Sequence, residues 1–231
     1  MRIAVLVSGG GTNLQAIIDC IKDNKLSGIE IARVISSREN TYAQKRAEDF
    51  NIPVSVIVRK NYRCQKDYDI ALLNELKNDA VELIVLAGFL SFLGTDFICT
   101  YKNRIINVHP SLVPSFCGDG MYGIRPHEAA IEKGVKISGA TVHFVDGEYD
   151  AGPIILQKAV IVEDDDTPEI LQKRIMIEAE QVILPKAIEL FSKGAIIIEG
   201  RKTKIISKPI FETRYTFSSD GNSTPLEGSG S

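Results

Sequence analysis

An asparagine and a histidine two residues apart are the side chains in this sequence best suited to acyl-group chemistry. Asn107 and His109 come at the end of an apolar run, and side chains two apart on a strand project to the same side. An amide and a protonated imidazole can both donate hydrogen bonds to a carbonyl oxygen as it becomes a tetrahedral oxyanion. The pair alone is weak evidence, because a histidine at a strand end is as often structural as catalytic.

The histidine needs an acidic neighbour to be charged near neutral pH, because an unperturbed imidazole is mostly neutral there. Asp150, in a turn-rich segment further along the chain, is the candidate that would raise the pKa of His109. Asp146 and Glu148 in the same turn are competing candidates. The sequence therefore predicts a proton-handling pair made of His109 and a carboxylate of this turn.

The other two histidines are expected to have smaller roles. His143 falls in the middle of a predicted strand, where a half-buried supporting histidine is the commoner outcome. His127 is expected at the surface, where a helix starts. The spacing of His109, His143 and Asp150 matches no metal-binding motif, so we expect no metal.

Three consecutive glycines follow the first apolar segment, within Ser8–Asn13. Glycines there allow backbone N–H groups to turn toward an anion, and the start of a helix adds partial positive charge. A dinucleotide site would need another glycine where Leu14 stands, and a nucleoside triphosphate loop would need Gly-Lys-Ser/Thr. The loop therefore predicts a site for a single phosphate, with a tight turn that binds no ligand as the alternative.

Apolar segments rich in β-branched residues alternate with helical patterns over the first half of the chain. Continuous apolar strands between amphipathic helices predict an α/β fold with a parallel sheet covered on both faces. The expected strands are Ile3–Val7, Ile29–Ser36, Val54–Val58, Leu83–Leu86 and Ile105–Val108, and the expected helices are Leu14–Ile21, Tyr42–Phe50, Gln65–Lys77 and Ser91–Thr100.

The pattern changes after Pro110, where a loop containing glycine and proline leads to longer strands. We expect an antiparallel C-terminal part and a long helix kinked at Pro185. The segments are a short helix near His127–Glu132, strands Ile137–Val145 and Ile154–Val162, a helix from Asp166–Glu169 to Ser192, and hairpin strands Ala195–Glu199 and Thr203–Ile206. The sequence thus predicts one domain over residues 1–206 and a polar, mobile tail over residues 207–231.

The composition is typical of a water-soluble globular protein. The formal charge is −3, and the absence of a basic run argues against nucleic acid as a partner. The first apolar segment is too short for a signal peptide or a membrane helix, so no membrane partner is expected and the cytoplasm is the expected location. None of the four cysteines forms a Cys-x-x-Cys pair, which favours ordinary thiols.

Taken together, several segments resemble the phosphoribosylglycinamide formyltransferase family. They are Ser8–Ile17, Leu86–Phe89, Asn107–Pro114, Gly139–Val145 and Asp150–Leu156, in matching order and spacing over about residues 1–191. The resemblance implies a Rossmann-like fold with a mostly parallel, twisted sheet. It also implies transfer of a formyl group from 10-formyltetrahydrofolate to the amine of glycinamide ribonucleotide, in de novo purine (IMP) synthesis. Small molecules are then the expected partners, and the oligomeric state is left open.

The resemblance also implies roles for individual residues. Asn107 and His109 would stabilise a tetrahedral intermediate, Asp150 would raise the His109 pKa, and His143 would support them. The phosphate and ribonucleotide would be bound by Gly11, Thr12, Asn13 and Glu180. The folate would lie against Leu90, Ser91, Phe92, Leu93, Asn107, Asp146, Gly147, Glu148, Tyr149 and Asp150, with Gln65 or Lys66 near its glutamate tail.

Two departures from the family pattern leave alternatives open. The loop Ser115–Gly123 is longer than in the family, and Gln65 stands where a basic residue is common. A formyltetrahydrofolate deformylase-like hydrolase and a formyltransferase acting on another amine are the alternatives. The tail is expected to be too short for the RNA-binding domain of a methionyl-tRNA formyltransferase. A non-catalytic nucleotide-binding module would leave Asn107, His109 and Asp150 without a purpose.

Overall fold

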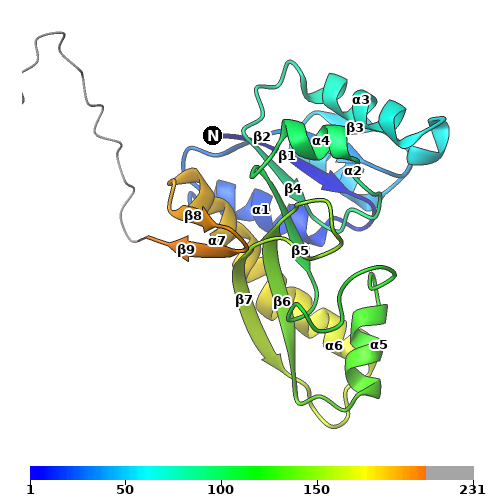
Figure 1. Cartoon of the computed structure of the whole chain (residues 1–231), viewed down its shortest axis with the longest axis vertical. Helices are drawn as coiled ribbons and strands as arrows, with labels where there is room; N and C mark the ends of the chain where they lie inside the picture. The colour runs from blue at the N-terminus through cyan, green and yellow to red at the C-terminus, as the bar shows by residue number, and fades with distance from the viewer. Residues whose placement is uncertain (207–231) are drawn as a thin grey trace, which may run out of the picture.

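Seven strands form one sheet at the centre of the structure, a computed structural model that describes residues 1–206 (Figure 1). Their spatial order is β3-β2-β1-β4-β5-β6-β7, in which β1 to β5 are parallel while β6 and β7 are each antiparallel to the strand before them. The strands are β1 (Arg2–Val7), β2 (Glu30–Ser36), β3 (Val54–Val56), β4 (Leu83–Leu86), β5 (Ile105–His109), β6 (Ile137–Phe144) and β7 (Ile154–Ile161), and a separate hairpin consists of β8 (Ile196–Glu199) and β9 (Lys202–Ile205). The predicted fold class, a mostly parallel α/β sheet with an antiparallel C-terminal part, is confirmed.

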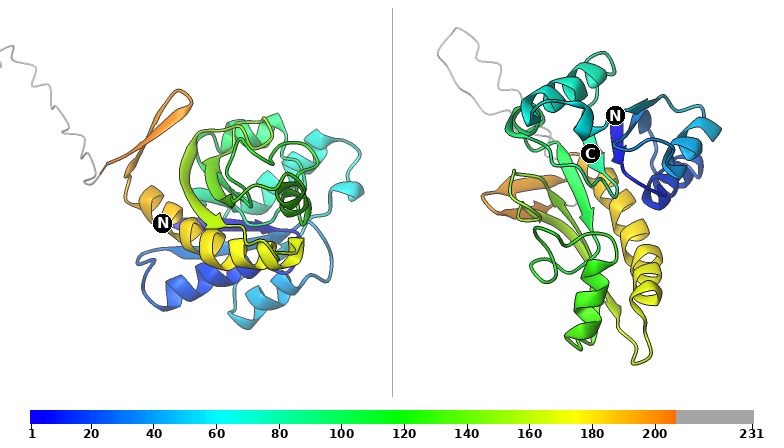
Figure 2. Two further views of the ribbon diagram at one scale, coloured as in Figure 1. Left: turned by 90° about the horizontal axis from the view of Figure 1, so that it is seen from below. Right: turned by 90° about the vertical axis from the view of Figure 1, so that its right-hand side faces the viewer.

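Helices cover both faces of the sheet (Figure 2). One face packs mainly against α1, α2, α6 and α7, and the other packs against α3 and α4. The helices are α1 (Thr12–Lys22), α2 (Tyr42–Asp49), α3 (Gln65–Leu76), α4 (Thr95–Thr100), α5 (Arg125–Glu132), α6 (Pro168–Ile175) and α7 (Gln181–Ser192), with a short 3₁₀ turn η1 (Arg59–Asn61) and a π-helical turn η2 (Met176–Glu180) between α6 and α7.

The central strand β1 is buried on both of its faces. Ile3, Val5 and Val7 belong to one core and Ala4 and Leu6 to the other, and all five are 0% exposed. Burial on two sides explains why central parallel strands are apolar throughout rather than alternating in polarity. This packing also fixes the position of the carboxyl end of β1, where the glycine loop begins.

One helix is shorter than the sequence predicts. It was expected to begin at Ser91, but α4 begins at Thr95. The N–H of Gly94 donates a hydrogen bond to Oδ1 of the buried Asp69 over 3.0 Å. This contact with α3 supports residues 91–94 in a loop conformation, and the prediction of a helix there is wrong.

The expected interruption of the last long helix lies before Pro185 rather than at it. A proline has no N–H and crowds the carbonyl four residues earlier, yet Pro185 lies inside α7. The regular helix instead widens into the π turn Met176–Glu180 directly before α7. Such turns are frequent at functional sites, and this one ends on Glu180, which lines the cleft described below.

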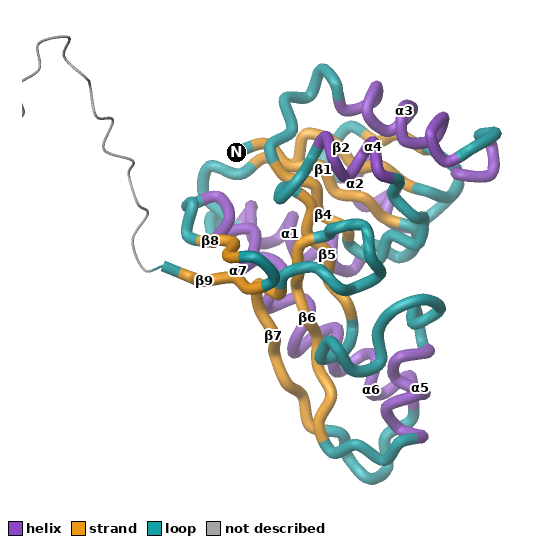
Figure 3. Tube along the Cα trace, in the orientation of Figure 1, coloured by secondary structure: helices purple, strands orange, loops and turns teal. Residues whose placement is uncertain are grey.

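The hairpin of β8 and β9 was predicted and is confirmed, and it lies against the start of β7 (Figure 3). Thr203 Oγ1 donates a hydrogen bond to the Ile154 carbonyl over 2.5 Å. Arg201 donates another to the Ala151 carbonyl over 2.9 Å. The hairpin is therefore attached to the turn that precedes β7.

The described part of the chain ends at residue 206. Within it, no helix combines the length and the apolar character needed to cross a membrane. The tail predicted for residues 207–231 lies outside the described residues, and the single domain expected over residues 1–206 stays a prediction.

Candidate active site

A cleft of about 650 Å³ opens at the carboxyl ends of β1, β4 and β5. Its wall includes the glycine loop after β1, the segment after β4 and the end of β5. Ligands of open α/β sheets commonly bind at this edge, because the loops that follow the parallel strands converge there. The cleft thus lies at the sheet edge that the sequence indicates.

Four polar side chains meet where β5 ends. Asn107 and His143 pair across β5 and β6, and Asn107 Nδ2 lies 3.2 Å from His143 Nε2. The carboxylate oxygens of Asp150 lie 3.3 Å from His109 Nδ1 and 3.5 Å from His143 Nε2. The structure therefore brings together Asn107, His109 and Asp150, and it places His143 in the same cluster.

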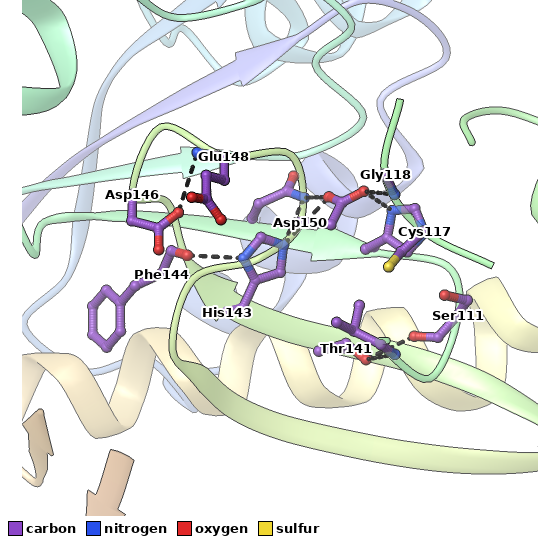
Figure 4. A network of polar contacts seen from close by, with 12 residues as sticks. Ser111, Cys117, Gly118, Thr141, His143, Phe144, Asp146, Glu148 and Asp150 are labelled. Carbon is purple, nitrogen blue, oxygen red and sulfur yellow. Dashed lines mark hydrogen bonds and ion pairs between the residues drawn. The ribbon is translucent and has the colours of Figure 1, made fainter. Parts of the chain in front are cut away.

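Asp150 is held by a turn with an uncommon backbone conformation (Figure 4). Its φ of +50° lies in the left-handed region, which residues other than glycine seldom adopt. Its Oδ2 accepts a hydrogen bond from the Gly118 N–H over 3.0 Å. A Cβ on Gly152 would lie 1.9 Å from the Phe144 carbonyl oxygen, so only glycine allows the turn to pass this close to β6.

Two opposing effects act on the pKa of His109. The ring is 4% exposed, and burial lowers its pKa, outweighing the Asp150 carboxylate and the Phe116 carbonyl, which raise it. His109 Nε2 lies 3.0 Å from that carbonyl oxygen, so both ring nitrogens face acceptors and a protonated ring could donate to both. Asp150 therefore acts in the predicted direction, but the net pKa lies below the ordinary histidine value, which the sequence does not predict.

Asp150 itself is favoured as a carboxylate. Burial raises its pKa, but contacts with His143, with His109 and with the Gly118 N–H have the larger combined effect, and the pKa lies below the usual aspartate value. The cluster thus holds a fixed negative charge beside two imidazole rings. Among residues 1–206, no group of three or more His, Cys, Asp or Glu side chains is arranged to hold a metal ion.

His143 orients the amide of Asn107. His143 Nδ1 lies 2.8 Å from the Phe144 carbonyl oxygen, which only accepts, so Nδ1 carries a hydrogen. In the neutral ring, Nε2 then accepts from Asn107, and a protonated ring would instead donate to Asp150. Asn107 Nδ2 lies 3.4 Å from Asp150 Oδ1, a long contact that leaves its second hydrogen available to a ligand oxygen.

The glycine loop leads from β1 into α1 and lines the cleft. Gly11 has a φ of +69°, and a Cβ there would lie 2.7 Å from Ala43 Cβ, so packing against α2 requires glycine. A Cβ on Gly9 or Gly10 would meet nothing within 4 Å, although both residues line the cleft. Packing within the free protein does not explain these two glycines, whereas close approach of a ligand to the backbone does.

A buried hydrogen bond joins the glycine loop to the π turn. Asn13 Nδ2 donates to Glu180 Oε2 over 2.6 Å, and the two residues are 7% and 9% exposed. Burial raises the pKa of Glu180, and the bond from Asn13 opposes this only in part. Asn13 Oδ1 is shielded and has no hydrogen-bonding partner among the described residues.

Apolar side chains are unusually exposed at one end of the cleft. Leu90, Phe92 and Tyr149 are 43%, 43% and 55% exposed, and the ring centroids of Phe92 and Tyr149 lie 5.5 Å apart. We call these three residues the apolar rim. Exposed aromatic surface inside a cleft suits a flat, ring-containing ligand. The cleft is also lined by neighbouring residues of the same segments and by one residue of the glycine loop. They are Ser91, Leu93, Gly147, Glu148, Asp150 and Thr12.

Three residues expected to contact the folate do not line the cleft. Gln65 Nε2 donates to the Phe92 carbonyl over 3.0 Å, so it supports the loop that bears the apolar rim. Asp146 Oδ1 accepts from the Glu148 N–H over 3.3 Å and braces its own turn (Figure 4). Lys66 is exposed on α3. Gln65 and Asp146 therefore support segments of the cleft wall without lining the cleft themselves.

The sequence analysis missed His127 as a cleft residue. It was expected at the surface, but it is 0% exposed and lines the cleft, so that prediction is wrong. The buried side of α5 consists of Pro126, His127 and Ala130, and the three-residue helical spacing of the last two could have revealed this. Other cleft residues not foreseen are Met121, Tyr122, Gln172, Lys173 and Met176.

Comparison with known proteins gives a consistent result. Residues 1–188 match the model of the formyl transferase family. A trifunctional purine biosynthetic protein adenosine-3 from Chironomus tentans is 41% identical over 87% of this chain, which spans only 14% of that protein. The phosphoribosylglycinamide formyltransferase of Haemophilus influenzae is 36% identical over 93% of this chain and 98% of its own length. The crystal structure of glycinamide ribonucleotide transformylase 1 from Symbiobacterium toebii superposes with a TM-score of 0.84, at 41% identity, over 89% of this chain and 94% of that one.

Proposed function

The chain belongs to the formyl transferase family, and on that basis we propose that it transfers the formyl group of 10-formyltetrahydrofolate to the amine of glycinamide ribonucleotide. The names of its full-length relatives support this acceptor. The observation that carries the proposal is the position of Asn107, His109 and Asp150 in one cleft with the glycine loop and the apolar rim. The place of the reaction in purine (IMP) synthesis belongs to the same proposal. The cytoplasmic location stays a prediction.

The cleft offers matching surfaces for the two substrates. The apolar rim can pack against the ring system of the folate, since Phe92 and Tyr149 expose aromatic surface toward the cleft. Gly9 and Gly10 leave room for the phosphate of the ribonucleotide to approach the backbone. The carboxylate of Glu180, which lines the cleft and is oriented by the hydrogen bond from Asn13, can accept a hydrogen bond from the same substrate.

The residues at the end of β5 can handle the charge and proton changes of formyl transfer. The acceptor amine adds to the formyl carbon, the bond from that carbon to the folate nitrogen breaks, and one proton passes from the amine to the departing nitrogen. The Asn107 N–H that makes only a long contact with Asp150, together with the protonated ring of His109, would stabilise the oxygen that gains negative charge. His109 Nδ1 is held by Asp150, so its Nε2–H is the donor that can exchange the Phe116 carbonyl for the substrate oxygen.

Incubation of the purified protein with both substrates tests the proposal directly. We expect tetrahydrofolate to be released, followed by absorbance, only when glycinamide ribonucleotide and 10-formyltetrahydrofolate are both present. His109→Ala should abolish most of this signal while both substrates still bind. Release of tetrahydrofolate and formate without the acceptor would instead identify a deformylase-like hydrolase.

Separate titrations of each substrate distinguish the remaining alternatives. A nucleotide-binding module would bind the ribonucleotide but not the folate, because it would have no use for the apolar rim. A formyltransferase that acts on another amine would bind 10-formyltetrahydrofolate. In the presence of the ribonucleotide it would form tetrahydrofolate only slowly. Binding of both ligands together with rapid turnover supports the proposed reaction.

A further inference from the structure

The glycine loop after β1 has a backbone that could take several orientations if nothing outside the loop held it. Glycine has no Cβ and populates a wide range of φ and ψ, and a Cβ on Gly9 or Gly10 would meet nothing within 4 Å. A phosphate that binds to backbone N–H groups needs those groups to point into the cleft. Contacts from outside the loop are therefore needed to fix its direction before a phosphate arrives.

Helix α2 makes such contacts through the carbonyl oxygens of the loop. The Ala43 N–H donates a hydrogen bond to the Gly9 carbonyl over 3.1 Å. Arg46 Nε donates another to the Gly10 carbonyl over 2.9 Å. Both glycines line the cleft, whereas Ala43 and Arg46 do not. The two carbonyl groups are therefore directed at α2 and not at the cleft.

The geometry of the peptide unit converts these contacts into an orientation of the N–H groups. In a trans peptide, the carbonyl of one residue and the N–H of the next lie in one plane and point in opposite directions. The contact between the Gly10 carbonyl and Arg46 therefore directs the Gly11 N–H away from α2, toward the cleft that Gly11 lines. This N–H has no acceptor among the described residues, so it is available to an anion.

The guanidinium group of Arg46 is itself held by two further contacts. One of its terminal nitrogens, Nη1, donates to Gln15 Oε1 over 2.8 Å. Its Cζ lies 4.7 Å from the centroid of the Tyr42 ring, a distance at which a cation is attracted to an aromatic face. The rigid, planar group can donate in two fixed directions at once, which a flexible ammonium group does less well. Both acceptors, the Gly10 carbonyl and the Gln15 amide, are neutral, so neither contact cancels the positive charge.

We propose that Arg46 is a positioning residue for the ribonucleotide, which holds the peptide between Gly10 and Gly11 so that the Gly11 N–H faces the substrate phosphate. Arg46 contacts the loop on the side away from the cleft and does not touch the substrate. This inference rests on the proposed function only in taking a phosphate as the ligand of the glycine loop. Without Arg46 the peptide could rotate, and the apparent affinity for phosphate would fall with the fraction of molecules whose loop is correctly oriented.

Calorimetric titrations of three variants test this role. Arg46→Gln removes both the charge and the rigid pair of donors, whereas Arg46→Lys keeps the charge alone. Lys45→Gln removes a charge from the exposed neighbouring position of α2 and is the matched control. Affinities for glycinamide ribonucleotide, inorganic phosphate and 10-formyltetrahydrofolate are measured at about 0.05 M and about 0.5 M salt. Turnover is followed by tetrahydrofolate release, and folding by the Tm.

The expected result is a loss confined to the phosphate-bearing ligands. Arg46→Gln should bind the ribonucleotide and inorganic phosphate about tenfold more weakly, with a higher KM for the ribonucleotide and an unchanged kcat at saturation. Arg46→Lys should recover only part of this loss. Because the loss arises from loop orientation, the ratio of variant to wild-type affinity should be the same at both salt concentrations. Folate affinity in every variant, and all affinities of Lys45→Gln, should stay within about twofold of the wild type.

Three results would overturn the positioning role while leaving the proposed function in place. A folded Arg46→Gln that binds both phosphate ligands within about twofold of the wild type would show that the loop is fixed without Arg46. Equal weakening of folate and ribonucleotide binding would indicate a general structural role. Full recovery in Arg46→Lys, with a loss in Arg46→Gln that disappears at high salt, would assign the effect to charge alone.

The design also decides if one variant or one ligand fails. If Arg46→Gln does not fold, Arg46→Lys decides alone: a selective loss of phosphate binding supports the positioning role, and an unchanged affinity overturns it. A wild-type protein that binds inorganic phosphate but not glycinamide ribonucleotide would overturn the proposed acceptor, and the phosphate titrations would still decide the role of Arg46. A wild-type protein that binds neither ligand would overturn both.

Discussion

Replacing the buried carboxylate by its neutral amide, Glu180→Gln, should make the free protein more stable. Glu180 is 9% exposed, and Asn13 Nδ2 is its one hydrogen-bonding partner among the described side chains. Burial raises the pKa of Glu180, and the bond from Asn13 lowers it by less. A glutamine can keep that bond through its amide oxygen without placing a charge in the interior.

The size of the effect follows from the competing free energies. Removing a carboxylate from water costs several kcal/mol even after the protein relaxes, whereas one hydrogen bond to a charged group returns about 1.5–3 kcal/mol. We therefore expect Glu180→Gln to raise the free energy of unfolding at pH 7 by about 1–2 kcal/mol, because a neutral amide is cheaper to bury. For a chain of this size, that corresponds to a Tm higher by about 2–8 °C.

The pH dependence of this gain provides an internal control. Because the folded pKa of Glu180 is raised, its contribution to stability is fully present below the unfolded value of 4.5 and is lost as the pH rises through the folded pKa. The advantage of Glu180→Gln should therefore vanish below about pH 4.5 and grow toward neutral pH.

Calorimetric unfolding from pH 4 to pH 8 measures both the gain and its pH dependence. Glu178→Gln removes an exposed carboxylate two residues away and should change stability by less than about 0.5 kcal/mol. A Glu180→Gln protein that is less stable than the wild type at pH 7 would refute the reasoning, as would a gain that does not vary with pH. The same variant should bind the ribonucleotide more weakly, since a carboxylate retained at a stability cost is expected to serve ligand binding.

The remaining predictions concern the polar cluster and two glycines. His109→Ala and Asp150→Asn should each lower kcat by about 10²–10⁴, and the double variant should lose little more, because the two residues act as one unit; a double loss equal to the product of the single losses would contradict this. In Asp150→Asn, activity should decline at lower pH on the alkaline side than in the wild type, because burial lowers the His109 pKa and the carboxylate opposes it; an unchanged alkaline limb in the rate profile would assign that role to another group. Gly10→Ala should fold normally, since its Cβ meets nothing within 4 Å, yet calorimetry should show weaker binding of the ribonucleotide and unchanged binding of the folate. Gly94→Ala would place a Cβ 2.2 Å from Asp69 Oδ2, so the free energy of unfolding should fall by about 1–3 kcal/mol, with folate binding weakened more than ribonucleotide binding; an unchanged Tm would argue against the clash.

Features set by local pattern could be predicted from the sequence. The strand expected over Leu83–Leu86 is β4, because a strand buried on both faces leaves an uninterrupted apolar run. The common direction of Asn107 and His109 follows from the two-residue period of a strand. The place of Asp150 beside them came from a turn in the right part of the chain and from the family resemblance, since no spacing rule links residues on different loops.

Features set by contacts between distant segments could not be predicted. Helix α4 begins late because Gly94 is bonded to Asp69, 25 residues earlier in the chain. Gln65 occupies the aligned position of a ligand-binding residue but points to a backbone carbonyl. The net pKa of His109 depends on how deeply the ring is buried, and this depth is a property of the complete fold rather than of its neighbours in sequence.

The bond between Asn13 and Glu180 also has a consequence for the chain during its synthesis on the ribosome. The two residues are 167 positions apart, so at about 5–20 residues per second roughly ten to thirty seconds separate their incorporation. Throughout that interval the glycine loop has been made but lacks its buried partner. Any stabilisation by a ligand that contacts both residues therefore arises only after Glu180 has been added to the chain.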